Sequence, residues 1–126
     1  MTRSEFVRLL VLNSICDDFE NVDQVILRDV AETGAKCGLT IERAEVVDAL
    51  ASLVSDGLAK AYILPGPTSD AFSGELQSMP ALTAVEEHFR TYFYITKQGM
   101  NLHLANEAWW PLDDDGNIKE GWQLAG

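Results

Sequence analysis

The chain has 126 residues, of which 47% are hydrophobic, and carries nine Lys and Arg residues against twenty Asp and Glu residues, a formal net charge of −11. This length accommodates one domain with a sizeable core, but not two ordinary domains. The acidic charge is opposite to that of proteins that bind nucleic acid through its phosphates. The first residues lack a secretory signal pattern and no apolar run is long enough to span a membrane, so we expect a cytoplasmic protein with no membrane contact.

Helical periodicity predicts two helices in the first part of the chain. Thr2 is a suitable N-cap, Glu5 completes a capping box, and the apolar positions that follow predict a helix over residues 3–16. A second capping box, formed by Asn21 and Gln24, opens another amphipathic run. We expect this second helix to fade near Gly34.

A short turn and a third helix come next. Gly38 supplies the turn, and Thr40 is a natural N-cap for the residues after it. The apolar positions then form a continuous helical face, which predicts a helix over residues 41–56. Gly57 stands where a helix usually stops.

Two strands and a fourth helix complete the predicted elements. Residues 58–64 and 90–95 are rich in β-branched and aromatic side chains, and we expect them to pair antiparallel. Thr96 can cap a helix over residues 97–108. Gly99 lies near the start of this helix, where glycine is unfavourable.

Two local patterns accompany this order of elements. Leu50 and Leu53 lie on one helical face, and Gly57 and Leu58 follow them at the start of the first strand. The second pattern, at residues 94–99, is an aromatic residue followed by Thr and then Gly, with the spacing aromatic-x-Thr-x-x-Gly.

With these patterns, residues 22–100 resemble the winged helix-turn-helix domain of PadR-like and MarR-like bacterial transcriptional regulators. The resemblance implies a mainly α fold with a small antiparallel β-hairpin (α+β): a three-helix core, a wing and a C-terminal helix. We therefore expect one domain over residues 1–108, with an insertion in the wing at about 65–89, and a Trp-rich acidic tail over 109–126. Hairpin loops usually have only a few residues, so the wing insertion departs from the pattern.

The predicted third helix is acidic, which is unusual for the element that would enter a DNA groove. It carries Arg43 against Glu42, Glu45, Asp48 and Asp56, a net charge of −3. The resemblance implies that residues early in this helix read bases. The candidate nucleic-acid contacts are the few cations and one hydroxyl near the turn and wing: Lys36, Thr40, Arg43, Lys60 and Arg90.

All three tryptophans lie in the last 18 residues. Aromatic anchors are enriched where one chain docks on another, and the resembling families often form dimers, so we expect a homodimer. The alternative is that the tail folds back and closes the core of its own domain. The candidate partner-interface residues are Phe6, Leu10, Trp109, Trp110 and Trp122.

The sequence predicts no metal, cofactor or catalytic site. His88 and His103 have neighbouring carboxylates but no set of three ligands, and Cys16 and Cys37 fit no metal spacing, so we expect free, buried thiols. No nucleophile elbow or phosphate-binding glycine loop is present. We therefore expect a protein that is not an enzyme.

Three functions fit these observations. The first is a transcriptional regulator that contacts DNA through the cations of the turn and wing. The second is an acidic winged-helix adaptor that binds another protein without binding DNA. The third is a protein of a phage or mobile element that masks a basic partner by its charge.

Overall fold

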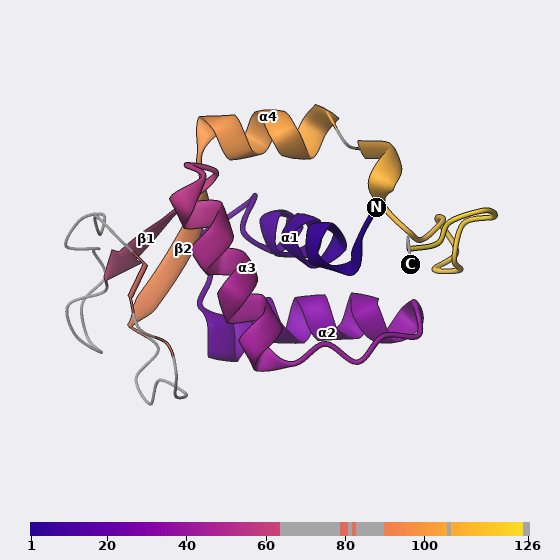
Figure 1. The fold of residues 1–126 in the computed structure, drawn as a ribbon, viewed down its shortest axis with the longest axis horizontal. Coiled ribbons are helices and arrows are strands. Elements are labelled where there is room, and N and C mark those ends of the chain that lie inside the picture. Colours follow the sequence, from indigo (N-terminus) through magenta and orange to yellow (C-terminus); the bar gives the residue numbers. More distant parts are fainter. Residues whose placement is uncertain (64–78, 81, 83–89, 106, 125–126) are drawn as a thin grey trace.

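The computed structural model describes residues 1–63, 79–80, 82, 90–105 and 107–124. These residues form a mixed α+β fold of four α-helices and a two-stranded antiparallel sheet (Figure 1). The predicted class, mainly α with a small antiparallel hairpin, is confirmed at this level. The elements are α1 (Arg3–Ser14), α2 (Leu27–Lys36), α3 (Arg43–Ser55), β1 (Ala59–Ile63), β2 (Thr91–Ile95) and α4 (Lys97–Ala105).

Helix α1 lies at the centre, with α2, α3 and α4 packed around it (Figure 1). A helix that is apolar on nearly all sides is stable in water only when other elements cover it. Within α1, only Arg8 interrupts the buried run, whose members are Phe6, Val7, Leu9, Leu10, Val11 and Leu12. The core of the protein is therefore built around its first helix.

Both predicted N-caps of the first two helices are present. The Thr2 hydroxyl accepts a hydrogen bond from the Glu5 amide at 3.1 Å, and the Asn21 side chain accepts one from the Gln24 amide at 2.7 Å. Helix α1 ends two residues earlier than predicted. The second helix begins with a π-turn, η1 (Val22–Ile26), and continues as α2 to Lys36, beyond the predicted end near Gly34.

The prediction that Thr40 caps the third helix is wrong. Glu42 occupies the N-cap position with an extended backbone, and α3 begins at Arg43. The Thr40 carbonyl instead accepts a hydrogen bond from the Arg3 guanidinium at 2.7 Å. This contact fixes the turn between α2 and α3 to the start of α1.

The two strands pair antiparallel as predicted, with Ala61 opposite Phe93. Ala59, Ala61 and Phe93 face the core and are buried. Glu20 adds a bridge on the other edge of β2, because its amide and carbonyl exchange hydrogen bonds of 3.0 and 2.8 Å with Phe93. The chain between α1 and η1 is thereby tied to the sheet.

Thr96 caps α4 as predicted and also holds the preceding turn. Its hydroxyl accepts a hydrogen bond from the Gly99 amide at 3.0 Å and donates one to the Gly57 carbonyl at 2.7 Å. Helix α4 ends at Ala105 rather than near residue 108, and a 3₁₀ turn, η2 (Glu107–Trp109), follows.

The tail forms a compact turn. The Asp113 carboxylate accepts hydrogen bonds from the amides of Asp115 and Asn117, and Gly116 has a φ of 80°. Leu112 and Ile118 form a bridge across this turn. None of the described helices has the length and apolarity that crossing a membrane requires.

Gly99, which looked unfavourable in a helix, is explained by the close approach of α4 to the start of β1. A Cβ atom at this position would lie 2.0 Å from the Leu58 carbonyl oxygen and 2.7 Å from Ile95 Cγ1. Backbone cannot yield as a flexible side chain can, so the approach requires glycine.

We expect Gly99→Ala to lower the free energy of unfolding by about 2–3 kcal/mol, because α4 must move away from Leu58. Asn101→Ala, on the exposed face of the same helix, is the control and should change it by less than about 0.5 kcal/mol. Urea denaturation of both variants measures the difference. Equal free energies of unfolding for Gly99→Ala and Asn101→Ala would contradict the close packing of α4 against Leu58.

Candidate functional site

The start of α3 is the position at which the resemblance implies base contacts, and Arg43 stands there in an ion pair. Its Nε donates to Asp23 Oδ1 at 2.6 Å and its Nη2 donates to Asp23 Oδ2 at 3.1 Å. The Asp23 side chain is only 7% exposed and that of Arg43 is 20% exposed. This paired geometry is the bidentate form in which arginine holds a carboxylate most firmly.

The third donor group of Arg43 reaches the segment that precedes β2. Arg43 Nη1 donates a hydrogen bond to the Leu82 carbonyl oxygen. The Leu82 side chain is 5% exposed and belongs to the hydrophobic core. Leu82, in the segment between β1 and β2, is therefore docked beside the first turn of α3.

A second ion pair joins the start of α1 to α3. The Arg3 guanidinium donates to both carboxylate oxygens of Glu45, at 2.9 and 3.0 Å. The hydrogen bond from Arg3 lowers the pKa of Glu45, against the smaller opposite effect of desolvation, and the same bond raises the pKa of Arg3. The charge of Glu45 is therefore retained and compensated within the chain.

A third ion pair closes the other end of the α1–α3 contact, where Arg8 Nη2 lies 3.0 Å from Asp56 Oδ2. Between the two pairs lies an open groove of about 360 Å³, with Val7 and Ala49 in its apolar part and Asp48 at its edge. The exposed charged residues of α3 and its N-cap, apart from these pairs, are Glu42 and Asp48. The accessible charge of α3 is thus negative.

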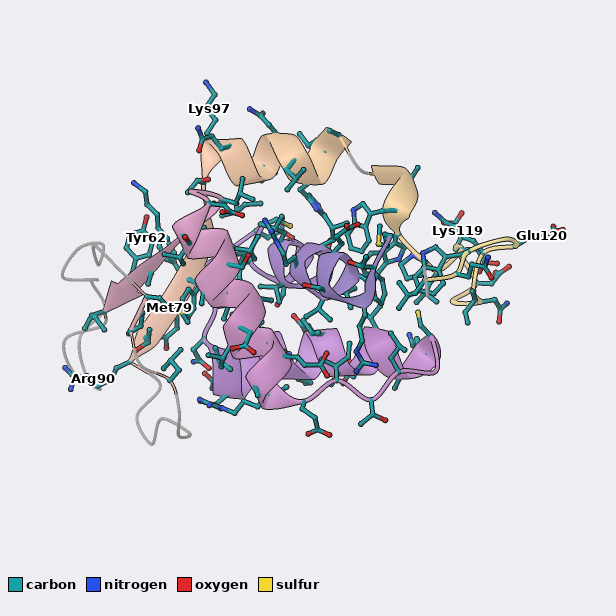
Figure 2. All side chains as sticks on the ribbon, in the orientation of Figure 1. Tyr62, Met79, Arg90, Lys97, Lys119 and Glu120 are labelled. Atoms are coloured by element: carbon teal, nitrogen blue, oxygen red, sulfur yellow. The ribbon has the colours of Figure 1, made fainter. Side chains whose placement is uncertain are left out.

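The remaining candidate DNA contacts do not form one basic face. Lys36 is exposed at the end of α2, whereas Lys60 and Arg90 lie toward opposite ends of the hairpin. Figure 2 shows Arg90, Lys97 and Lys119 at three separate margins of the molecule. Dispersed cations of this kind do not make the continuous basic surface that phosphate binding requires.

The tryptophan tail folds back on its own domain, which was the second of the two predicted alternatives. Phe6 and Leu10 are buried in the core of the chain. The Phe6 ring packs against Trp122 at 5.0 Å and Trp109 at 6.3 Å between centroids. Trp109 is buried, whereas Trp110 and Trp122 remain half-buried.

An aromatic cluster on the outer side of the hairpin escaped sequence analysis. The Phe19 ring makes edge-to-face contacts with Tyr62 and Tyr94, at centroid distances of 4.9 and 4.6 Å. Phe19 stands between acidic residues and outside any predicted element, so its sequence context gave no sign of this role. Alternation in the strands does predict that Tyr62 and Tyr94 face away from Phe93.

An acidic opening of about 400 Å³ lies between the end of α1 and α2. Asp17, Glu20, Asp29 and Glu32 line it, with Trp110 at its wall. Burial raises the pKa of Glu20, and the charges of Asp18 and Asp29 raise it further. Among the described residues, no three His, Cys, Asp or Glu side chains are placed to hold a metal ion.

The two cysteines and one histidine are partly buried and make no site together. Cys16 and Cys37 are free thiols, and burial raises the pKa of each. His103 packs against Trp109 at a centroid distance of 6.4 Å, and its buried Nδ1 has no hydrogen-bond partner. His88 lies outside the described residues.

No protein-family model, no curated protein and no solved structure matches the chain. The surface of α3 is the candidate functional site on the geometry given above. It combines three intramolecular ion pairs, exposed carboxylates and the docked residue Leu82.

The ion pair of Arg3 and Glu45 should contribute stability that depends on pH. Because the folded-state pKa of Glu45 is depressed, the contribution is present above its unfolded pKa of about 4.5 and is lost as pH falls through the folded-state value. We expect Arg3→Met to be less stable than the wild type at pH 7 and this difference to shrink below pH 4. Arg28→Met, which removes a looser pair with Asp29 at 3.6 Å, should show a smaller pH dependence when thermal unfolding is followed across the same range.

Removing Trp122 should test the folded-back tail. We expect Trp122→Ala to lower the free energy of unfolding by about 2 kcal/mol, less than for a fully buried tryptophan, because it uncovers Phe6. Gln123→Ala, at an exposed position beside it, is the control. Light scattering should give the same molar mass for both variants and the wild type. A change in mass without loss of stability would instead place Trp122 at an interface between chains.

Proposed function

We propose that the chain is a winged-helix protein that acts as an acidic adaptor, binding a protein partner and not reading DNA with α3. The order of helices, turn, helix and hairpin supports the winged-helix assignment, as does the Thr96 hydroxyl that joins the end of β2 to α4. In that fold, α3 is the element that would enter a major groove.

The observation that carries this proposal is that the arginine of α3 and the two arginines of α1 beside it each pair with a carboxylate of the chain. Arg3 pairs with Glu45, Arg8 with Asp56, and Arg43 with Asp23. What α3 offers to an incoming surface is then the carboxylates of Glu42 and Asp48 and the compensated pairs.

The free energies of the competing contacts of Arg43 also argue against base reading by α3. A bidentate contact of arginine with guanine contributes about 1–3 kcal/mol of base discrimination. To make it, Arg43 would give up its bidentate pair with the nearly buried Asp23 carboxylate, and breaking a buried ion pair costs about 3–5 kcal/mol. The ion pair of Arg43 with Asp23 is therefore favoured over a contact of Arg43 with a base.

A partner for this surface should carry cationic side chains. Charge complementarity speeds association and fixes the orientation of docking, and its effect weakens as salt screens the charges. An adaptor of this kind can still act in transcription, by binding a protein that itself contacts DNA. Homodimerisation through Phe6 or Leu10 is not part of the proposal, since the chain's own core contains both.

Charge reversal on α3 provides the test. We expect no binding of the wild type to mixed duplex DNA at about 50 mM salt, where non-specific affinity is strongest. Glu42→Lys combined with Asp48→Lys should create measurable, salt-sensitive binding, because it makes the proposed groove-facing helix cationic. Fluorescence anisotropy of a labelled duplex gives both results.

The matched control combines Asp114→Lys with Glu120→Lys in the tail, which changes the net charge equally but far from α3; Figure 2 shows Glu120 at the margin of the molecule. Equal DNA binding by the two double variants would contradict the winged-helix placement of α3. Binding of the wild type to DNA at low salt would instead favour the regulator.

A further inference from the structure

The groove between α1 and α3 has a floor of short side chains. Two from each helix line it between the charged residues: Ser4, Val7, Ala49 and Ser52. Val7 and Ala49 are buried, whereas Ser4 is exposed and Ser52 is half-buried. Arg3 and Arg8 line the same space, and the aliphatic part of an arginine side chain adds apolar surface. We refer to this space as the α1–α3 groove.

The ion pairs at its two ends set the length of the α1–α3 groove. Arg3 pairs with Glu45 at one end and Arg8 pairs with Asp56 at the other, so the charges at both ends are compensated. The lining residues of α3 run from Glu45 to Ser52, which is about 10 Å along a helix that rises 1.5 Å per residue. This length matches about two turns of a second helix lying in the groove.

Asp48 gives the α1–α3 groove an uncompensated negative charge. Its carboxylate is exposed at the edge of the groove, and no Lys, Arg or His of the described residues forms an ion pair with it. An apolar floor beside a single free carboxylate complements an aliphatic side chain with a cationic group close to it.

The walls of the α1–α3 groove favour a helical occupant over an extended one. Beyond the first turn of α1, the lining residues lie inside helices whose backbone groups already form hydrogen bonds within the helix. An extended peptide would therefore lose hydrogen bonds to water and find few replacements in the groove. A helix satisfies its own backbone groups before it docks.

We propose that the α1–α3 groove is the docking site for a basic amphipathic helix of the partner protein. An aliphatic side chain of that helix lies over Val7 and Ala49, and a lysine or arginine one turn along it pairs with Asp48. Helices bind grooves in this way through anchors spaced three or four residues apart. This inference rests on the adaptor function proposed above and names the element of the partner that the acidic surface of α3 receives.

A synthetic helix tests the groove without knowledge of the partner. The probe is a labelled peptide of leucine, lysine and alanine, about 18 residues long because shorter helices are marginal in water, with its leucines on one face and lysines beside them. The control probe has the same composition, but its leucines are dispersed around the helix. We expect anisotropy to show at least tenfold tighter binding of the first probe. In a ¹⁵N-labelled chain, the amides of Val7 and Ala49 should shift most on its addition.

Variants of the chain separate the floor of the groove from its charge. Ser4→Phe places a large ring in the groove and should weaken binding of the first probe at least tenfold. Its control is Ser55→Phe, at an exposed position of α3 that does not line the groove. Asp48→Asn should weaken binding about threefold and reduce its salt dependence. Asp114→Asn, which changes the net charge equally, is the control for this effect.

Either of two results would overturn the inference: equal affinity of the wild type for the two probes, or equal weakening by Ser4→Phe and Ser55→Phe. Failure of the groove and failure of the adaptor function give different results. Equal binding of both probes, lost on combining Glu42→Lys with Asp48→Lys, would leave an acidic adaptor surface without a groove. Binding of the wild type to duplex DNA at low salt, with the preference for the first probe intact, would contradict the adaptor function and leave the groove.

Discussion

The burial of α1 is the constraint on which the rest of the structure depends. Six residues of α1, Phe6, Val7 and Leu9–Leu12, are apolar and buried, and α2, α3, α4 and the tail supply their cover. The ion pairs of Arg3 and Arg8 then fix α3 against α1 at both ends of their contact. The surface that α3 presents outward is a consequence of this packing.

The same packing decides which charges α3 presents to other molecules. A fold of this kind can serve different functions, and the residues on its surface decide which. Here the arginines around α3 stabilise contacts inside the chain, and the carboxylates that remain exposed face outward. A cationic protein surface complements that arrangement better than a phosphate backbone does.

Local patterns in the sequence predicted the helices, the hairpin and the caps at Thr2, Asn21 and Thr96, because each depends on neighbouring residues. The contacts that determine which side chains the surface of α3 exposes join residues far apart in the sequence, so local patterns did not predict them. The partner of Arg43 is Asp23 in another helical segment, and the tail could equally have covered Phe6 or a second chain. Thr40 satisfied the local rule for a cap, but α3 begins at Arg43 with Glu42 at the N-cap position, two residues beyond Thr40.

The contact between Phe6 and Trp122 has a consequence for the order of folding during synthesis. Chains are made at about 5–20 residues per second, so roughly ten seconds separate the translation of these two rings. During that time the apolar surface of α1 lacks part of its cover, and exposed surface of this kind favours aggregation. Chaperone binding to the nascent chain is then most valuable before Trp122 reaches α1.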